Sequence, residues 1–197
     1  MIEGPEVEAH HHHKTGHSKL DLIFASLAVV LSLVSVMVAL HHGKTMERLV
    51  EANTWPNLSY DTGNLVDDGH TQAVTLSLMN TGVGPARIEN FEVFYKDQPV
   101  ADGAALMKAC CGLATIDFSS SQVTGEVLPT RDRIDFIEVP RAENPALFDV
   151  LNKERFKIRV RACYCSVFDD CYVLDTKARR PERVAQCSAS QGLEYHQ

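Results

Sequence analysis

Residues 22–40 read LIFASLAVVLSLVSVMVAL, and this stretch decides the architecture of the chain. Its 19 residues carry no charge, and its most polar side chains are three serines. A helix rises about 1.5 Å per residue, so the stretch reaches about 28 Å, close to the hydrocarbon thickness of a bilayer. We therefore predict a transmembrane helix over residues 22–40.

Two other interpretations of this stretch fit it less well. A buried core helix is usually shorter and carries polar residues at every turn. A cleaved signal peptide has an apolar region of about 7 to 15 residues that ends at a site of small residues. Here the apolar run is longer, and Ala39 is the one suitable small residue near its exit. We favour an uncleaved anchor.

Length and charge limit the part of the chain beyond the anchor. The chain has 197 residues, and the tail and the span leave about 150 of them for one domain of ordinary size. The formal net charge is −7, whereas domains that bind nucleic acid are usually basic. We expect no nucleic-acid partner.

The cysteines indicate the compartment. All six follow the span: Cys110, Cys111, Cys163, Cys165, Cys171 and Cys187. An even number on one side of an anchor is typical of disulfides in an oxidising space. Lys14 and Lys19 before the span balance Lys44 and Arg48 after it, so flanking charge does not set the orientation. We predict a single-pass protein with a cytoplasmic N-terminus and a C-terminal domain outside the cytoplasm, which in a bacterium means the inner membrane and the periplasm.

The predicted organisation has five parts. They are a disordered cytoplasmic tail (1–21), the transmembrane helix (22–40), a juxtamembrane helix or linker (41–54), a periplasmic β-sandwich domain (55–175) and a C-terminal tail (176–197). The histidine run at residues 10–13 suggests metal binding, but four adjacent histidines define no coordination geometry. We interpret the run as part of a flexible tail and expect no cofactor and no metal site.

Small residues recur along one side of the predicted span, at spacings of three and four. They are Ala25, Ala28, Ser32, Ser35 and Ala39. Such a stripe lets two helices approach closely in a membrane, so it predicts a helix-packing face and a parallel homodimer.

The domain alternates between short apolar-polar strands and turns. Residues 72–80 place Val74, Leu76 and Leu78 on one face, which predicts a half-buried strand. Two short helices are expected: one over 101–113, opened by Asp102 and closed near Gly112, and one that Asn144 caps. The fold class is therefore all-β: an immunoglobulin-like antiparallel β-sandwich with one or two short helices, preceded by one transmembrane helix.

Residues 156–165 form the most regular predicted strand. Its inward set is Phe156, Ile158, Val160, Ala162 and Tyr164. The other face starts from a basic row, Arg155, Lys157, Arg159 and Arg161, and continues with Cys163 and Cys165. The row is a weak candidate for binding an anionic polymer or lipid headgroup, but pairing with acidic residues on neighbouring strands explains it better.

The cysteine spacing favours structural disulfides. Cys165 and Cys171 bracket a short hairpin and are the first predicted pair. Adjacent cysteines would close a strained ring, so we expect Cys110 or Cys111 to reach Cys163 or Cys187. The Cys-x-x-Cys spacing of zinc and redox sites is absent, but a metal-binding or thiol-redox protein that uses this cluster stays the alternative.

The chain resembles uncharacterised single-span bacterial inner-membrane proteins. The resemblance rests on the short tail, the span and the segments NTGVGPA at 80–86 and YCSVFDDC at 164–171, and it covers residues 22–175. It implies a periplasmic immunoglobulin-like domain. It implies no activity and no functional residues.

The sequence carries no nucleophile, phosphate-loop or dinucleotide motif, and His70 is the one histidine within the predicted domain. We therefore expect no enzyme and no catalytic residues. The predicted function is a membrane-anchored extracytoplasmic binding or assembly module. Its expected partners are membrane lipid and either a second copy of the chain or another envelope protein.

Overall fold

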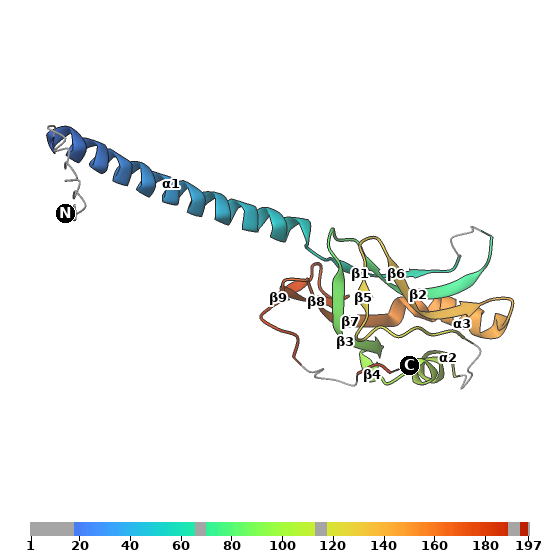
Figure 1. Cartoon of the computed structure of the whole chain (residues 1–197). Coiled ribbons are helices and arrows are strands. Elements are labelled where there is room, and N and C mark those ends of the chain that lie inside the picture. The colour runs from blue at the N-terminus through green and yellow to red at the C-terminus, as the bar shows by residue number, and fades with distance from the viewer. Residues whose placement is uncertain (1–17, 66–69, 113–117, 189–193, 197) are drawn as a thin grey trace, which may run out of the picture. The chain divides into compact units, whose positions relative to one another are not determined.

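The computed structural model describes residues 18–65, 70–112, 118–188 and 194–196. Its internal contacts divide the chain into two compact units, Met1–Arg48 and Leu49–Gln197. The first unit contains most of α1 (Ser18–Asn53), and the second contains all the described strands and the shorter helices (Figure 1).

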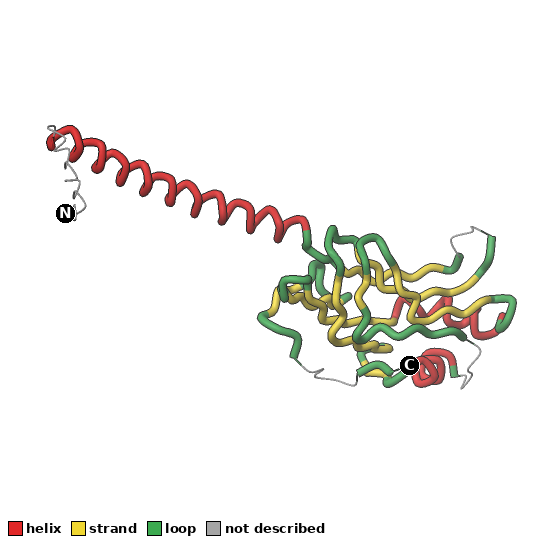
Figure 2. Tube along the Cα trace, viewed as in Figure 1, coloured by secondary structure: helices red, strands yellow, loops and turns green. Residues whose placement is uncertain are grey.

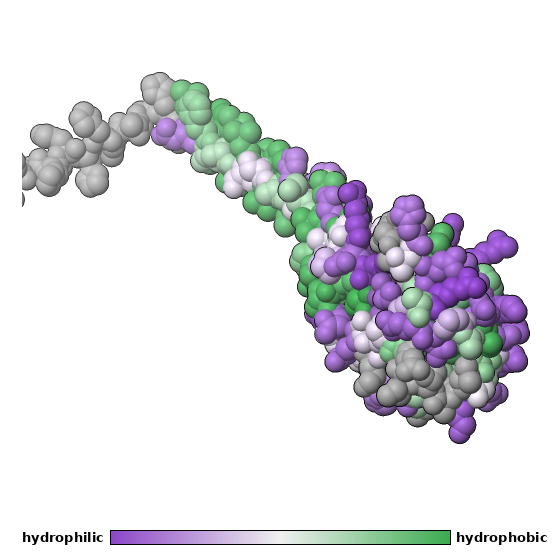
Figure 3. All heavy atoms as spheres, turned by 90° about the vertical axis from the view of Figure 1, so that its right-hand side faces the viewer, coloured by the Kyte–Doolittle hydropathy of each residue, from purple (hydrophilic) through white to green (hydrophobic). Residues whose placement is uncertain are grey.

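α1 is one continuous helix, and its large apolar side chains are exposed between residues 20 and 40. Within the described residues it is the one helix long and apolar enough to cross a membrane. The space-filling view shows this apolar surface along the helix, whereas the visible face of the domain is mostly hydrophilic (Figure 3). The helix predicted at 22–40 is confirmed in length and composition, and the segment expected as a helix or linker at 41–54 is helical up to Asn53.

α1 ends where Pro56 prevents its continuation. Proline has no backbone N–H and disfavours helical geometry in the residue before it. The Thr54 hydroxyl donates to the Val50 carbonyl at 2.9 Å, and the Thr54 N–H donates to the Glu51 carbonyl at 3.2 Å. These bonds satisfy carbonyls that the end of the helix would otherwise leave unpaired.

The smaller sheet has three antiparallel strands in the order β1-β2-β6. Their bounds are Leu58–Gly63, Ala73–Asn80 and Arg133–Pro140. Val74, Leu76 and Leu78 of β2 are fully buried, as the alternation predicted. Ser77 on the other face is buried too, because β2 is the central strand and the Ser77 hydroxyl donates to Asp135 at 2.6 Å.

The larger sheet is antiparallel, in the order β4-β3-β7-β8-β9, and β5 pairs with one end of β3. The bounds of β3, β4 and β5 are Ala86–Tyr95, Gln98–Val100 and Val127–Leu128. Those of β7, β8 and β9 are Ile158–Cys165, Cys171–Asp175 and Glu182–Val184. The tube view shows how loops link these strands (Figure 2). β3 and β7 lie at the centre of the sheet, so their inward residues form much of the core.

The strand predicted at 156–165 is confirmed from Ile158 onward, with Ile158, Val160, Ala162 and Tyr164 buried. Phe156 was predicted to point inward, and this is wrong: its side chain is 74% exposed. It lies in a 3-10 turn (Arg155–Lys157) that continues α3 before β7 begins, and a turn does not follow the alternation of a strand.

Both short helices begin at the predicted caps, and α2 also ends at the predicted glycine. Asp102 caps α2 (Gly103–Cys111) by accepting from the Ala105 N–H at 2.7 Å, and Gly112 ends it with a φ of 70°. Asn144 caps α3 (Pro145–Glu154) by accepting from the Leu147 N–H at 3.0 Å. A capping side chain replaces a backbone acceptor that the first turn lacks, so local sequence is enough to fix these ends.

The core lies between the two sheets. The ring of Phe91 on β3 meets that of Phe136 on β6 edge to face, with 5.0 Å between centroids. Tyr195 adds a third ring 5.6 Å from Phe91, and its N–H donates to the Phe91 carbonyl at 3.0 Å. The residues expected as a tail at 176–197 therefore include part of the domain, because β9 extends the sheet and Tyr195 is buried in the core.

Candidate functional site

Two disulfides join the larger sheet to the C-terminal segment. Cys165 on β7 lies directly opposite Cys171 on β8, and the two are bonded, which confirms the predicted hairpin pair. Cys163, two residues earlier on β7, is bonded to Cys187. The pairing of β9 with β8 places Val184 opposite Cys171, at the end of the sheet where the other cysteines lie, and Cys187 follows three residues later.

The expectation that Cys110 or Cys111 reaches Cys163 or Cys187 is wrong. The two adjacent cysteines are bonded to each other at the last residues of α2, with 3.8 Å between their Cα atoms. Cys163 and Cys187 already use each other, and the described cysteines include no free thiol. The partners follow from the strand order β7-β8-β9, which the spacing of cysteines along the chain does not reveal.

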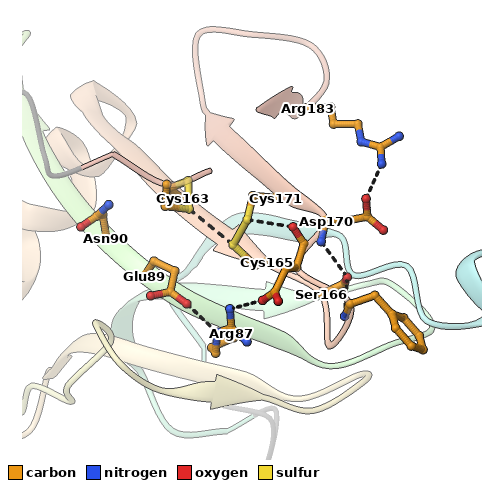
Figure 4. Close-up of a disulfide and its surroundings, with 12 residues drawn as sticks. Arg87, Glu89, Asn90, Cys163, Cys165, Ser166, Asp170, Cys171 and Arg183 are labelled. Atoms are coloured by element: carbon orange, nitrogen blue, oxygen red, sulfur yellow. Dashed lines mark hydrogen bonds and ion pairs between the residues drawn. A yellow bond between two sulfur atoms is a disulfide. The ribbon is translucent and has the colours of Figure 1, made fainter. Parts of the chain in front are cut away.

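The sulfurs of the two larger-sheet disulfides form a cluster, here called the sulfur cluster: Cys163, Cys165, Cys171 and Cys187. The Sγ atoms of Cys165 and Cys187 belong to different disulfides and lie 3.7 Å apart. Those of Cys165, Cys171 and Cys187 all lie within 4.8 Å of one another. Figure 4 shows Cys163, Cys165 and Cys171 side by side. Cys163 and Cys165, on the face of β7 that was expected to be outward, are therefore buried.

Polar contacts fix the hairpin that ends in this cluster. The Ser166 hydroxyl accepts from the N–H groups of Phe168 and Asp170, at 3.1 and 3.2 Å. Arg87 on β3 donates to Asp169 at 2.8 Å, and Arg183 on β9 pairs with Asp170 (Figure 4). The tip between β7 and β8 is therefore held from both neighbouring strands.

The cluster has the donor chemistry of soft metals and of thiol redox reactions. Among the described residues it contains the one group of three or more histidine, cysteine or acidic side chains close enough to share an ion. Thiolates bind zinc and copper(I), and thiolates also attack disulfides. In the disulfide form these sulfurs have no thiolate to offer, so either use starts with reduction.

The four residues of the predicted basic row do not share one exposed face. Lys157 pairs with Glu154 at 2.7 Å and Arg161 with Glu92 at 3.1 Å. The Nε of Arg159 donates to Asp175 at 2.9 Å, and the hydrogen bonds from this guanidinium hold the pKa of Asp175 below its usual value.

Arg155 differs from the other three because it is buried in the turn before β7. Its guanidinium donates to the Thr62 hydroxyl at 3.3 Å and lies 4.6 Å from the Phe156 ring centroid. Three cations of the row thus have carboxylate partners and the fourth faces inward. The weak anion-binding role stays a prediction. The structure gives it no support, because the four cations do not form one exposed row.

The predicted packing stripe of the span lies on α1 at the expected spacing. Ala25, Ala28, Ser32, Ser35 and Ala39 are all exposed there. The Ser35 hydroxyl donates to the Leu31 carbonyl at 2.8 Å, so its hydrogen bond is made within the helix. Because the stripe has the spacing that close helix packing needs, a homodimer through this face stays a prediction.

A group of exposed apolar residues where the chain enters the domain was not predicted from the sequence. It is here called the entry corner and consists of Trp55, Val83, Val167 and Phe168. Trp55 follows α1, Val83 lies in the turn after β2, and the other two form the tip of the β7–β8 hairpin. One signal could have indicated it: Val167 and Phe168 are adjacent apolar residues in a loop that should be polar.

Comparison with protein-family models, with curated proteins and with solved structures finds no match to this chain.

Proposed function

We propose that this protein is a membrane-anchored binding or assembly module without catalytic activity. α1 would hold it in the bacterial inner membrane, with residues 1–21 in the cytoplasm and the domain in the periplasm. The exposed apolar surface of α1 supports the anchor. The three disulfides support an oxidising location for the domain, because thiols in the cytoplasm are kept reduced.

We also propose that the domain is an immunoglobulin-like sandwich. In that fold the first, second and fifth strands share one sheet, and the third, sixth and seventh form the other. Here β1, β2 and β6 lie together, and β3, β7 and β8 are consecutive neighbours, with β4 beside β3. This order supports the proposal. α2 lies in the connection between β4 and β5, and α3 lies in the connection between β6 and β7.

The entry corner is the observation that carries the binding role. The Trp55 carbonyl accepts from the N–H groups of Val83 and Gly84, at 3.0 and 3.2 Å. A Cβ on Gly84 would lie 2.0 Å from the Thr54 carbonyl oxygen, so only glycine lets the turn after β2 approach this closely. The segment after α1 and the turn after β2 therefore form one closely packed, hydrogen-bonded unit.

The hairpin tip belongs to the same unit. Arg87, just after that turn, is bonded to Asp169 of the tip, and Arg183 lies 3.7 Å from Glu51 at the end of α1 as well as beside Asp170. These contacts connect all three segments of the entry corner. A rigid surface loses little conformational entropy when a partner binds.

The apolar side chains of this corner remain accessible to solvent. Trp55 is 46% exposed, and Val83, Val167 and Phe168 are between 55% and 58% exposed. Grouped exposed apolar residues with aromatic members are typical of protein interfaces, where tryptophan is among the commonest anchors. We propose that the partner is a protein of the cell envelope and that Trp55 and Phe168 are its principal contacts.

Photo-crosslinking of the full-length protein in intact cells tests this role. A photoreactive amino acid in place of Phe168 or Val83 is expected to give discrete protein adducts. The matched control replaces Phe156, which is 74% exposed but lies outside the corner. Equal adducts from position 156, or lipid adducts alone from position 168, would contradict a protein partner at this surface.

Protease accessibility tests the orientation. Protease added to right-side-out inner-membrane vesicles is expected to digest the domain, and protease added to inverted vesicles is expected to leave it intact. The reverse pattern would contradict the periplasmic location, whatever the crosslinking shows.

A metal-binding or thiol-redox protein is the second candidate, and the proximity of three sulfurs in the sulfur cluster favours it. A reduced cluster would offer four thiolates, the ligand set of tetrahedral zinc sites. Elemental analysis of reduced, full-length protein after dialysis against zinc tests this. One zinc per chain that is lost on Cys187→Ala but kept on Cys110→Ala would support the metal candidate, and no bound zinc would remove it.

A further inference from the structure

The two disulfides of the sulfur cluster touch each other. Disulfides in a small domain usually act separately, but here the Sγ atoms of Cys165 and Cys187 are 3.7 Å apart, which is van der Waals contact. Cys163, Cys165 and Cys171 are buried and Cys187 is half-buried, so the contact is shielded by the domain. A thiolate formed on either of the touching sulfurs would have the other disulfide as its nearest electrophile.

We propose that the cluster is a thiol–disulfide exchange site whose reaction partner is a dithiol reductant. Exchange proceeds when a thiolate attacks a disulfide sulfur and expels the second sulfur as a thiolate. The reductant first opens one disulfide: it becomes a disulfide itself and delivers two electrons and two protons to the protein. The protein then rearranges its remaining disulfide internally, without a further reactant.

Both entry routes give the same product. If the reductant opens Cys165–Cys171, the Cys165 thiolate attacks the Cys187 sulfur and expels the Cys163 thiolate. If it opens Cys163–Cys187, the Cys187 thiolate attacks the Cys165 sulfur and expels the Cys171 thiolate. In each case a Cys165–Cys187 bond forms, and the delivered protons remain on the thiols of Cys163 and Cys171.

The exchange changes where the C-terminal segment is tied. Cys163 and Cys165 are two residues apart on β7, so the attachment of Cys187 moves by about 7 Å along that strand. The hairpin tip loses its covalent link at the same time, because Cys171 no longer has a partner. One reduction event would thus loosen the tip that carries Val167 and Phe168 and move the segment after β9.

This inference does not rest on the binding role proposed above, and it specifies chemistry within the redox candidate. Failure of the exchange would leave the crosslinking result at the entry corner unchanged. It also differs from a zinc site, which needs all four sulfurs reduced.

Limited reduction tests the proposal directly. Full-length protein carrying Cys110→Ala and Cys111→Ala, in detergent micelles, receives about one equivalent of dithiothreitol and is then quenched with acid. After alkylation, peptides are mapped without reduction. We expect most molecules with two alkylated thiols to carry them on Cys163 and Cys171, with Cys165 linked to Cys187. Alkylation as the pairs Cys165 with Cys171, or Cys163 with Cys187, would overturn the exchange.

A pair of variants provides a second, independent measurement. Cys163→Ala/Cys171→Ala, reoxidised with oxidised glutathione, is expected to form the Cys165–Cys187 bond in nearly all molecules. The matched control, Cys165→Ala/Cys187→Ala, is expected to keep two free thiols and to form no disulfide, since Cys163 does not belong to the group of sulfurs within 4.8 Å. Two free thiols in the first variant, with the fluorescence of Trp55 unchanged, would contradict the proposal.

Discussion

Two regions of the domain use the same covalent bond, and they differ in how much chain the bond encloses. In the sulfur cluster, Cys163–Cys187 joins residues 24 positions apart and Cys165–Cys171 joins residues six apart. At the end of α2, Cys110–Cys111 joins neighbours. A disulfide stabilises a fold chiefly by restricting the unfolded chain, and this restriction grows with the enclosed loop. The two disulfides of the sulfur cluster should therefore stabilise the fold more than the disulfide at the end of α2 does.

Removing the long link of the cluster should have the largest effect. Cys163→Ala/Cys187→Ala is expected to lower the free energy of unfolding by about 3 kcal/mol, because the loop between residues 24 positions apart is then no longer closed in the unfolded chain. Urea unfolding of the full-length protein in micelles, followed by fluorescence of the single tryptophan, measures it. A loss no greater than that of the α2 pair would break the comparison.

Removing the hairpin link should have the next largest effect. Cys165→Ala/Cys171→Ala removes a bond that encloses a shorter loop, so we expect a loss of about 2 kcal/mol in the same urea experiment. A loss larger than that of Cys163→Ala/Cys187→Ala would show that loop length does not decide the order.

The ion pair between Arg159 on β7 and Asp175 on β8 is a non-covalent link between the strands that Cys165–Cys171 joins. Hydrogen bonds from Arg159 lower the pKa of Asp175, so Asp175 favours the folded state above the ordinary aspartate pKa, and this contribution is lost as pH falls through its folded pKa. Asp175→Asn should cost about 1 kcal/mol at pH 7, and its difference from wild type should shrink as the pH falls below the ordinary aspartate pKa.

The matched control for this prediction is Asp149→Asn. Asp149 pairs with Arg141 at 3.5 Å, and both side chains are largely exposed. Its removal should therefore change stability by less than about 0.5 kcal/mol. A deficit of Asp175→Asn that persisted at pH 2 would contradict an ionised Asp175 as its cause.

The pair on α2 should have the smallest effect of the three disulfides. Cys110→Ala/Cys111→Ala removes a bond between neighbours, which excludes few conformations of the unfolded chain, and alanine suits the last turn of a helix. We expect a loss below about 1 kcal/mol by urea unfolding. A loss of about 2 kcal/mol or more would mean that this bond holds α2 in place and would remove the contrast between the two regions.

Local features of the chain were predicted well where neighbours in sequence decide them. Asp102 and Asn144 cap helices because each side chain reaches the first free N–H groups of its own helix. The inward set of β2, Val74, Leu76 and Leu78, follows from the period of an extended chain, whereas the burial of its other face does not, because the predicted strand was only half-buried. The inward orientation predicted for Phe156 was wrong because the helix before it extends into a turn. The strand therefore begins two residues later than predicted.

The candidate site was predicted in part. The hairpin pair Cys165–Cys171 follows from short separation, which brings the two residues opposite each other once a hairpin forms. The partner of Cys163 does not, because Cys187 arrives only through the pairing of β9 with β8. The entry corner was also missed, since Trp55, Val83 and Phe168 come from three distant segments that meet only in the folded domain.

The sequence by itself determined the apolar helix, the caps of α2 and α3, the buried faces of β2 and β7 and the chemistry available to the domain. These depend on side-chain polarity, capping and period, all of which act between near neighbours. Tertiary structure alone decided the disulfide partners, the burial of Tyr195 and the contact between two disulfides. Those depend on strand order and register, which are set by the packing of residues far apart in the chain.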